Sequence, residues 1–396
     1  MKLLFVAMPN SIHTARWIKQ LPRDKWDIHL FPVDETHPHQ SLNKVTVHPF
    51  FRRPSGGLDP SLVQTGWWFP FDKGRTRFSA GLEKMWPNKF SQSSRLVSKI
   101  QKIKPDIVHS LEIQHAGYLT LEAREKLGGE FPPWIATNWG SDIYLFGRLS
   151  EHADRIRRVL SACNYYTCEC QRDVKLAWSF GFKGEALPTL PNSGGFALEK
   201  LEKFRGVGPT SSRRLILLKG YQGWAGRALV GLRAIELCAD KLRGYRIGVF
   251  SSGRDVQIAA ELVSQTTGIP IEIIPYCSHE EMLRLHGQAR ISIGLSISDA
   301  ISTSLLEAMV MGSFPIQSNT SCAYEWVQHN ETALLVHPED PQVIANAIQL
   351  AISDDPLVDH ASDLNHRTIL NRLNYTVIQS QVISMYEKVL NHRGTN

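Results

Sequence analysis

Apolar residues follow two alternating spacings along this chain of 396 residues. Short apolar runs are typical of buried strands, and the segments after them carry apolar residues at helical spacing. In the first half of the chain the runs fall at residues 2–8, 26–33, 105–112, 133–139, 164–170 and 185–192. Strands and helices that alternate in this way predict parallel sheets covered by helices.

The alternation stops once, in the polar and glycine-containing stretch "FALEKLEKFRGVGPTSSRR", which we interpret as a linker. It restarts at "LILLKG" and continues through "YRIGVFS", "IEIIPY", "ISIGLS" and "FPIQS". The chain is too long for a single core. We therefore predict an α/β protein with two Rossmann-like, doubly wound domains, residues 1–195 and 196–375. Residues 376–396 are predicted to form a closing helix that packs back on the first domain.

One stretch, "TGWWFPFDKGRTRFSAGLEKMWPNKF" at residues 65–90, fits neither a strand nor a helix. It mixes tryptophan and phenylalanine with lysine and arginine. One interpretation is a mobile loop that contacts an acceptor or a membrane surface. The other is an insertion that packs its aromatic side chains on the first domain.

The net charge of +6 favours phosphorylated ligands or an anionic membrane surface. Lysines and arginines recur singly and no nucleic-acid-binding motif appears, so we expect no nucleic-acid partner. The apolar start ends at Pro9, too early for a signal peptide, and no run reaches the roughly 20 apolar residues of a membrane span. The six cysteines lack paired spacing. These features predict a cytoplasmic protein, with peripheral contact with an anionic membrane left open.

The candidate chemistry centres on "SDAISTSLLEAMVMGSFPI", where a helix is predicted to begin among Ser302, Thr303 and Ser304. Free amides and the helix dipole at such a turn bind anions, above all phosphate. Asp299 and Glu307 flank the turn and suit hydrogen bonds from sugar hydroxyls. The segment thus predicts a site for a diphosphate between two sugars. The alternative is a capping box, in which Glu307 ties down the helix start through Ser304.

"DAISTSLLEAMVMGSFPI" resembles the signature of family 4 glycosyltransferases, with two acids separated by seven residues. Asp299 stands where that family usually has Glu. The resemblance runs from Arg243 onward and includes "EEMLRLHGQARISIGLS" and "YEWVQHNETALLVHPEDP". It implies the GT-B fold, in which two domains face a central cleft, and a retaining enzyme of the hexosyltransferase type. It also implies that Asp299 binds the donor sugar and Glu307 the ribose.

The resemblance is looser in the first domain and around the linker. "KPDIVHSLEIQHAGYL" implies that His115 lies beside the reacting sugar. "TNWGSDI" resembles a family segment that would bring Asp142 to the substrate, although Trp139 stands where His is common. "LLKGYQGWAGRALVGL" takes the place of the segment that holds the donor diphosphate, which makes Lys219 and Arg227 the candidate cations. Its glycines match no dinucleotide fingerprint, so a nicotinamide cofactor is disfavoured.

Three further residues are substrate-binding candidates. His13 follows the first strand and contacts ligand in one interpretation; in the other it has a capping or core role. Tyr276 and Cys277 follow a strand of the second domain, where the resembling family clasps the base. His109 is interpreted as a packing residue.

The resulting hypothesis is a glycosyltransferase of polysaccharide biosynthesis that needs no metal and no cofactor. Its donor would be a nucleotide diphosphate sugar, and its acceptor a saccharide, a glycolipid or another hydroxyl. Two alternatives stay open at this point. One is a GT-B nucleotide-sugar epimerase, and the other is a noncatalytic nucleotide- or sugar-binding protein.

Overall fold

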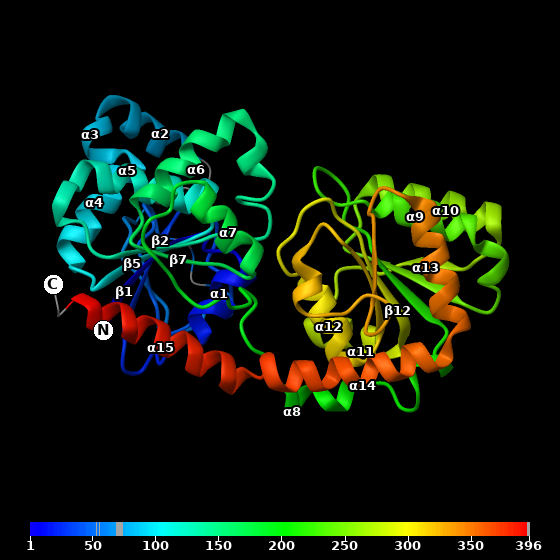
Figure 1. Ribbon diagram of the computed structural model, residues 1–396. Helices are drawn as coiled ribbons and strands as arrows, with labels where there is room; N and C mark the ends of the chain where they lie inside the picture. The colour runs from blue at the N-terminus through cyan, green and yellow to red at the C-terminus, as the bar shows by residue number, and fades with distance from the viewer. Residues whose placement is uncertain (53, 55, 69–73, 394–396) are drawn as a thin grey trace. The chain divides into compact units, whose positions relative to one another are not determined.

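The computed structural model describes residues 1–52, 54, 56–68 and 74–393. It divides into two compact units. Unit 1 contains Met1–Gly195 and Ile378–Asn396, and unit 2 contains Phe196–Val377. Each unit is built on one parallel sheet with helices packed against it (Figure 1). This architecture confirms the predicted α/β fold class.

The strands of unit 1 form a parallel sheet in the order β4-β3-β2-β1-β5-β6-β7-β8. Their bounds are β1 Lys2–Ala7, β2 Asp27–Pro32, β3 Thr46–Val47, β4 Val63–Gln64, β5 Ile107–Leu111, β6 Trp134–Thr137, β7 Tyr165–Thr167 and β8 Glu185–Ala186. The chain adds strands on one side of β1 and then returns to the other side with β5. Ligands of doubly wound sheets bind at the carboxyl ends of the strands where the order reverses.

Helices cover both faces of this sheet. Their bounds are α1 Ile12–Lys19, α2 Arg75–Met85, α3 Pro87–Phe90, α4 Gln92–Ile103, α5 Tyr118–Leu127, α6 Ser150–Ala162, α7 Gln171–Ser179 and α15 Tyr375–Arg393. Successive side chains of a strand point to opposite faces. Leu3 and Phe5 of β1 pack in a core with α1 and α15, whereas Leu4 and Val6 pack with α4 and α5.

A buried polar network ties α15 to the core of unit 1. Trp17 Nε1 donates to the hydroxyl of Tyr386 (2.9 Å), and that hydroxyl lies 2.6 Å from His109 Nδ1. His109 Nε2 in turn lies 2.6 Å from Thr137 Oγ1. Burial lowers the pKa of His109 to about 3, so the ring is neutral and carries one proton. The Tyr386 hydroxyl accepts from Trp17, and the single proton of the neutral His109 ring lies on one of its two nitrogens, so one ring nitrogen donates and the other accepts.

Tyr386→Phe should destabilise unit 1, because it leaves the Trp17 and His109 nitrogens buried without their partner. We expect a loss of about 1–3 kcal/mol, measured as a lower urea midpoint. Tyr276→Phe is the matched control, since the Tyr276 side chain is fully exposed. Equal midpoints for the two variants would contradict the role of the network.

Residues 65–90 were predicted to lack regular structure, and that prediction is wrong. The segment contains helices α2 and α3. Phe78, Leu82 and Met85 have helical spacing in α2, but Gly81 and the surrounding basic residues obscure the pattern. Residues 69–73 of the segment lie outside the described residues.

The strands of unit 2 form a parallel sheet in the order β11-β10-β9-β12-β13-β14. They are β9 Leu215–Lys219, β10 Arg246–Phe250, β11 Ile271–Ile273, β12 Ala289–Gly294, β13 Phe314–Ser318 and β14 Leu334–Val336. The helices are α8 Leu198–Leu201, α9 Ala228–Leu237, α10 Arg254–Thr267, α11 His279–Gln288, α12 Thr303–Met311, α13 Pro341–Ser353 and α14 Asp355–Arg372. Here the strand order reverses between β9 and β12.

The stretch interpreted as a linker is packed into unit 2. Phe196, Leu198 and Phe204 are buried in a core shared with α12. The polar residues between them concealed this anchoring. Within the described part of the chain, none of the helices combines the length and hydrophobicity that a bilayer span demands.

Candidate active site

In unit 2 a lysine meets the amino end of a helix at the point of strand-order reversal. Lys219 is the last residue of β9, and Ser302 is the N-cap of α12. Lys219 Nζ donates to Ser302 Oγ at 3.4 Å. The Ser302 side chain forms no cap bond and instead lies 2.8 Å from Ser304 Oγ. A cation and the positive end of a helix dipole therefore share one place, which suits a ligand with several negative charges.

The capping-box interpretation of Glu307 is wrong. The helix begins at Thr303 with Ser302 as its N-cap, so Ser304 already lies inside the first turn. The Glu307 side chain is buried, and its Oε1 accepts a hydrogen bond from His279 Nε2 at 2.8 Å. Glu307 thus belongs to a polar cluster with α11 instead of serving the helix start.

The second carboxylate oxygen of Glu307 faces a buried histidine. His286 Nε2 lies 3.8 Å from Glu307 Oε2, and His286 Nδ1 lies 2.9 Å from Ser292 Oγ. Burial lowers the pKa of His286 to about 4, so this ring is neutral. Sequence analysis missed both His279 and His286. The available signal was the place of His279, which follows the candidate Cys277 by two positions and begins α11.

Tyr276 and Cys277 lie between β11 and α11, as the sequence predicts. The Tyr276 side chain is fully exposed. Cys277 is half-buried, and its thiol pKa is raised, first by burial and then by the charges of Glu281 and Glu307. The thiol is therefore near Glu307, although no described contact joins it to a ligand-binding group.

Asp299 lies in the loop between β12 and α12 and accepts the backbone N–H of Ala300 at Oδ1 (2.9 Å). Burial, and then the charge of Asp299, raises the pKa of Tyr221. The Tyr221 ring centroid is 6.0 Å from Lys219 Nζ. Tyr221 thus lies near both Asp299 and Lys219. It was not predicted, although it stands two residues after Lys219.

Arg227 is engaged elsewhere in unit 2. Its Nε donates to Glu339 Oε1 (3.0 Å) and its Nη1 to the carbonyl of Gly226 (2.9 Å). A Cβ at Gly226 would lie 2.1 Å from the carbonyl oxygen of Tyr221, so only glycine fits there. The structure brings Lys219 to the start of α12, while the guanidinium of Arg227 is held by Glu339.

In unit 1, the loop after β5 holds His115 in a strained setting. Glu112 has a φ of +86°, which is unusual for a residue other than glycine, and it precedes a π-helical turn at Ile113–Gly117. Its carboxylate accepts the backbone N–H of His115 (2.9 Å) and of Ala116 (3.2 Å). Backbone strain and π-helical turns both concentrate at functional sites.

Glu112 also orients the ring of His115. Its Oε1 lies 3.1 Å from His115 Nδ1, and this hydrogen bond is the main cause of the raised pKa of His115. The His115 side chain is 67% exposed, which leaves Nε2 as the nitrogen available to a ligand. Glu112 was not predicted, although an acid three residues before the candidate histidine was the signal.

The side chain of Asp142 is buried and accepts hydrogen bonds from two backbone amides. Its Oδ2 accepts the N–H of Ile113 (2.9 Å) and of Trp139 (2.7 Å). Burial, and then the charge of Glu112, raises its pKa well above the usual range. Asp142 therefore fixes the π-helical turn and its own loop. The Trp139 ring lies 5.6 Å from that of His13, whose N–H is bonded to the N-cap Ser11.

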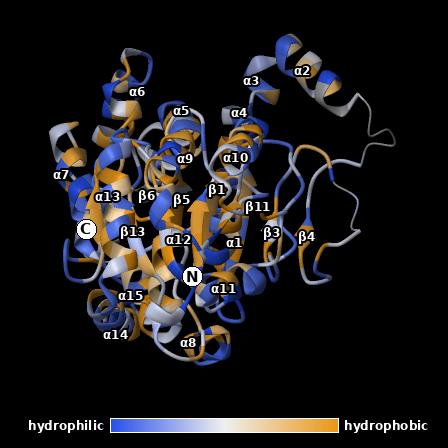
Figure 2. Ribbon diagram, turned by 90° about the vertical axis from the view of Figure 1, so that its right-hand side faces the viewer, coloured by the Kyte–Doolittle hydropathy of each residue, from blue (hydrophilic) through white to orange (hydrophobic). Residues whose placement is uncertain are grey.

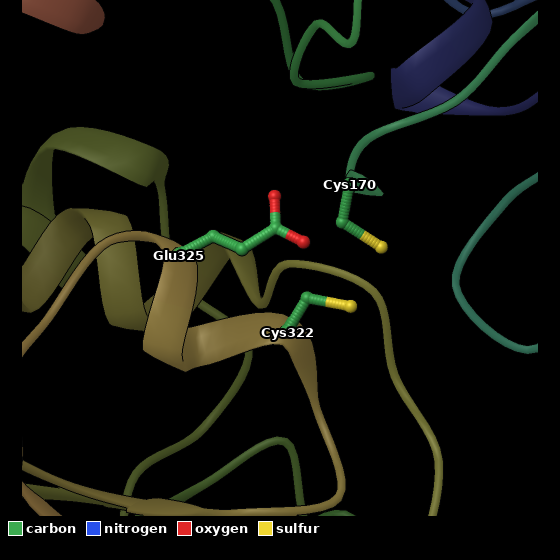
Figure 3. A group of neighbouring side chains, drawn as sticks. All are labelled: Cys170, Cys322 and Glu325. Atoms are coloured by element: carbon green, nitrogen blue, oxygen red, sulfur yellow. The ribbon is translucent and has the colours of Figure 1, made fainter. Parts of the chain in front are cut away.

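Possible metal ligands in unit 2 include Cys322 and Glu325, at the two ends of a short 3₁₀ helix (Figure 3). Two ligands from one unit are fewer than the three or four that protein zinc sites use. Cys170, drawn with them, belongs to unit 1. The pair by itself does not make a metal site.

Residues 260–368 match the family described as glycosyl transferases group 1, and residues 77–169 match the family described as glycosyl transferase 4-like. The chain belongs to the group 1 glycosyltransferases. Among curated proteins, no sequence relative matches it. The matched ranges of this glycosyltransferase contain Asp299, Glu307, His279, Glu112 and His115, whereas Lys219, Arg227 and His13 lie outside them.

Solved structures share the fold of this glycosyltransferase over nearly their whole length. Sucrose-phosphate synthase from Thermosynechococcus elongatus has a TM-score of 0.70 at 14% identity, covering 99% of this chain and 100% of its own. HepE from Anabaena, in complex with UDP and glucose, has a TM-score of 0.69 at 13% identity, covering 98% and 100%. Trehalose 6-phosphate synthase from Burkholderia multivorans has a TM-score of 0.70 at 12% identity, covering 100% and 98%.

Glu112→Gln should lower the pKa of His115, because the amide removes the negative charge that favours the imidazolium. The ring protons of His115 report this pKa in an NMR titration. Glu122→Gln is the control, since the exposed Glu122 pairs with Arg155 in the same unit. A His115 titration that is the same in both variants would contradict the assigned pair.

Proposed function

We propose that this protein is a retaining glycosyltransferase of the hexosyltransferase type. Unit 2 binds a nucleotide diphosphate sugar, and unit 1 binds a saccharide, a glycolipid or another hydroxyl acceptor. The observation that carries the proposal is the contact of Lys219 with Ser302 at the start of α12, with Glu307 buried further along the same helix. The fold shared with HepE, which was solved with UDP-glucose, supports this donor class.

The chemical problem is the departure of a nucleoside diphosphate from the anomeric carbon. Fixed positive groups aimed at the leaving oxygens stabilise the charge that develops there. We assign this role to Lys219 and to the amides around Ser302, Thr303 and Ser304. Arg227 joins them only after it leaves Glu339, so its contribution stays a prediction.

The two acids of the signature take the sugars on either side of the diphosphate. We assign the donor-sugar hydroxyls to Asp299 and the ribose hydroxyls to Glu307. Each hydrogen bond to a charged acceptor is worth roughly 1.5–3 kcal/mol. Tyr276 and Cys277 are assigned to the base, which leaves Tyr276 exposed until a ligand is bound.

His115 is the group of unit 1 that we assign to the reacting sugar, through Nε2. Glu112 holds Nδ1 and Asp142 holds the turn, so the ring needs little reorganisation when ligand binds. His13 and Trp139 are assigned to the acceptor. We assign no covalent nucleophile, and retention follows from reaction on one face through an ion-pair-like state.

Glu307→Ala should weaken UDP binding about 10- to 100-fold, as expected for one or two lost charge-assisted hydrogen bonds at 1.4 kcal/mol per factor of ten. Binding is measured by calorimetry, after a thermal-shift screen of nucleotide sugars has identified the base. A ligand at about 100 times its Kd should stabilise the protein by about 2.7 kcal/mol. Glu272→Ala, an exposed carboxylate of the same unit, is the control. If Glu307→Ala binds UDP with unchanged affinity but has lower thermal stability, Glu307 has a structural role and does not bind the ribose.

Treatment with EDTA should leave the transfer rate unchanged, because Lys219 and the α12 amides supply the positive charge that a metal would otherwise provide. Nucleoside diphosphate release is measured with donor, acceptor and chelator present. Lys219→Ala should lower this rate strongly and Lys175→Ala should not. A rate that falls with EDTA and recovers with added Mg²⁺ would contradict the metal-free proposal. Conversion of the donor to an isomer without acceptor would favour the epimerase instead.

A further inference from the structure

Unit 1 carries an exposed apolar surface that the proposed reaction does not use. Among the described residues between β4 and α3, five large side chains are exposed by about half or more: Trp67 (55%), Trp68 (76%), Phe78 (48%), Met85 (66%) and Trp86 (51%). We call this set the aromatic surface. Single exposed apolar residues are ordinary, but a contiguous group marks a site of interaction.

Two members of the aromatic surface, Trp67 and Phe78, are joined through the buried rings of Phe50 and Phe51, whose centroids lie 4.6 Å apart. The Trp67 ring lies 5.4 Å from that of Phe50, and the Phe78 ring lies 6.2 Å from that of Phe51. Phe50 and Phe51 are buried beneath them. The exposed rings therefore cap one hydrophobic floor and are gathered in one place.

Helices α2 and α3 present the rest of this surface. In α2, Phe78, Leu82 and Met85 share one side at helical spacing, and hydrophobic and hydrophilic segments alternate along the helix (Figure 2). Trp86 follows directly, and its ring lies 6.2 Å from that of Phe90 in α3. A short amphipathic helix with an open apolar side, flanked by tryptophan, is typical of segments that lie in a membrane interface.

A row of positive charge begins at the floor of the aromatic surface. Arg95, Lys99 and Lys102 share one face of α4, and we call them the basic stripe. The Arg95 guanidinium carbon lies 4.5 Å from the centre of the Phe50 ring. The pKa of Lys99 is lowered, first by burial and then by the charges of Lys102 and Arg95. Like charges at this helical spacing repel one another, and a bound anion relieves that repulsion.

We propose that the aromatic surface and the basic stripe together dock unit 1 on a membrane that contains anionic lipids. The rings enter the interface while the stripe meets the negative headgroups. Arg95 also faces Glu35 at 3.8 Å, so Lys99 and Lys102 supply most of the uncompensated charge. A second copy of the chain fits less well, because a two-fold interface would place the same positive surface against itself.

Docking itself does not depend on the proposed reaction. The consequence of docking for catalysis does rest on the proposed reaction. If the acceptor of the proposed transfer is a glycolipid, this surface brings unit 1 to the membrane that contains the acceptor. Among the acceptors proposed above, docking favours the glycolipid, because that acceptor lies in the membrane.

The test is cosedimentation of the full chain with vesicles of phosphatidylcholine and phosphatidylglycerol, against vesicles of phosphatidylcholine alone. We expect binding to the anionic vesicles that weakens as salt rises. The double variant Trp67→Ser/Trp86→Ser should bind at least about tenfold more weakly. Lys99→Gln/Lys102→Gln should lose the preference for phosphatidylglycerol. Trp178→Ser, which removes an exposed tryptophan of α7, is the matched control and should bind like the wild type.

Circular dichroism checks that each variant is folded. If the double variant does not fold, Trp68→Ser, which alters the most exposed ring of the surface, replaces it. Failure of the wild-type protein to bind anionic vesicles would overturn the proposal. So would a dimer in gel filtration that the Trp68→Ser change dissociates, since the surface would then join two copies. Nucleoside diphosphate release with a soluble acceptor, measured separately, tests the transfer reaction alone, so failure of docking and failure of the reaction are distinguishable.

Discussion

The candidate donor site depends on the adjacency of β9 and β12. These strands are neighbours in the sheet although Lys219 and Ser302 are 83 positions apart in the chain. Because both strands are parallel, their carboxyl ends open at the same edge, where the strand order reverses. The last residue of one strand therefore meets the helix that follows the other. Neither a lone lysine nor a lone helix start would concentrate as much positive potential.

Unit 1 repeats this geometry with different chemistry. The segments that follow β1, β5 and β6 bring His13, His115 and Trp139 to the corresponding edge, but the buried titratable side chains there are acids. Asp142 and Glu112 bind backbone amides of the turn that carries His115. Those hydrogen bonds offset the strain of a non-glycine residue at positive φ. The result is an exposed histidine on a rigid support.

The parts of the fold that could be read from sequence are those whose signal is local. β1 and β9 are almost continuous apolar runs, and their burial follows from composition. By contrast, β3 and β4 contain two residues each, too few to establish a period. They exist because β2 offers hydrogen bonds to β3, and β3 offers them in turn to β4. The helix α2 was missed because Gly81 and the basic residues around it obscure the helical spacing of Phe78, Leu82 and Met85.

The same distinction separates the site residues that were predicted from those that were missed. Lys219 could be placed because it ends the strand β9, and the start of α12 could be placed because a regular helix begins there. His279 could not be assigned to Glu307, 28 positions away, without the packing of α11 on α12. Arg227 has the right charge in the right segment, yet its pairing with Glu339, 112 positions away, decides where the guanidinium points. Sequence fixes which charges are available, and tertiary contacts decide which of them reach the ligand.

The setting of Glu307 explains how a buried carboxylate can serve a polar ligand. An isolated buried charge is costly, whereas one that accepts hydrogen bonds is stabilised. His279, partly exposed, donates to one oxygen, and the neutral, fully buried His286 lies 3.8 Å from the other. The carboxylate is thus held in place by His279 while retaining capacity to accept further hydrogen bonds. Hydroxyls that bind to it meet an acceptor that is already in place, so little of their binding energy is lost to reorganisation of the site.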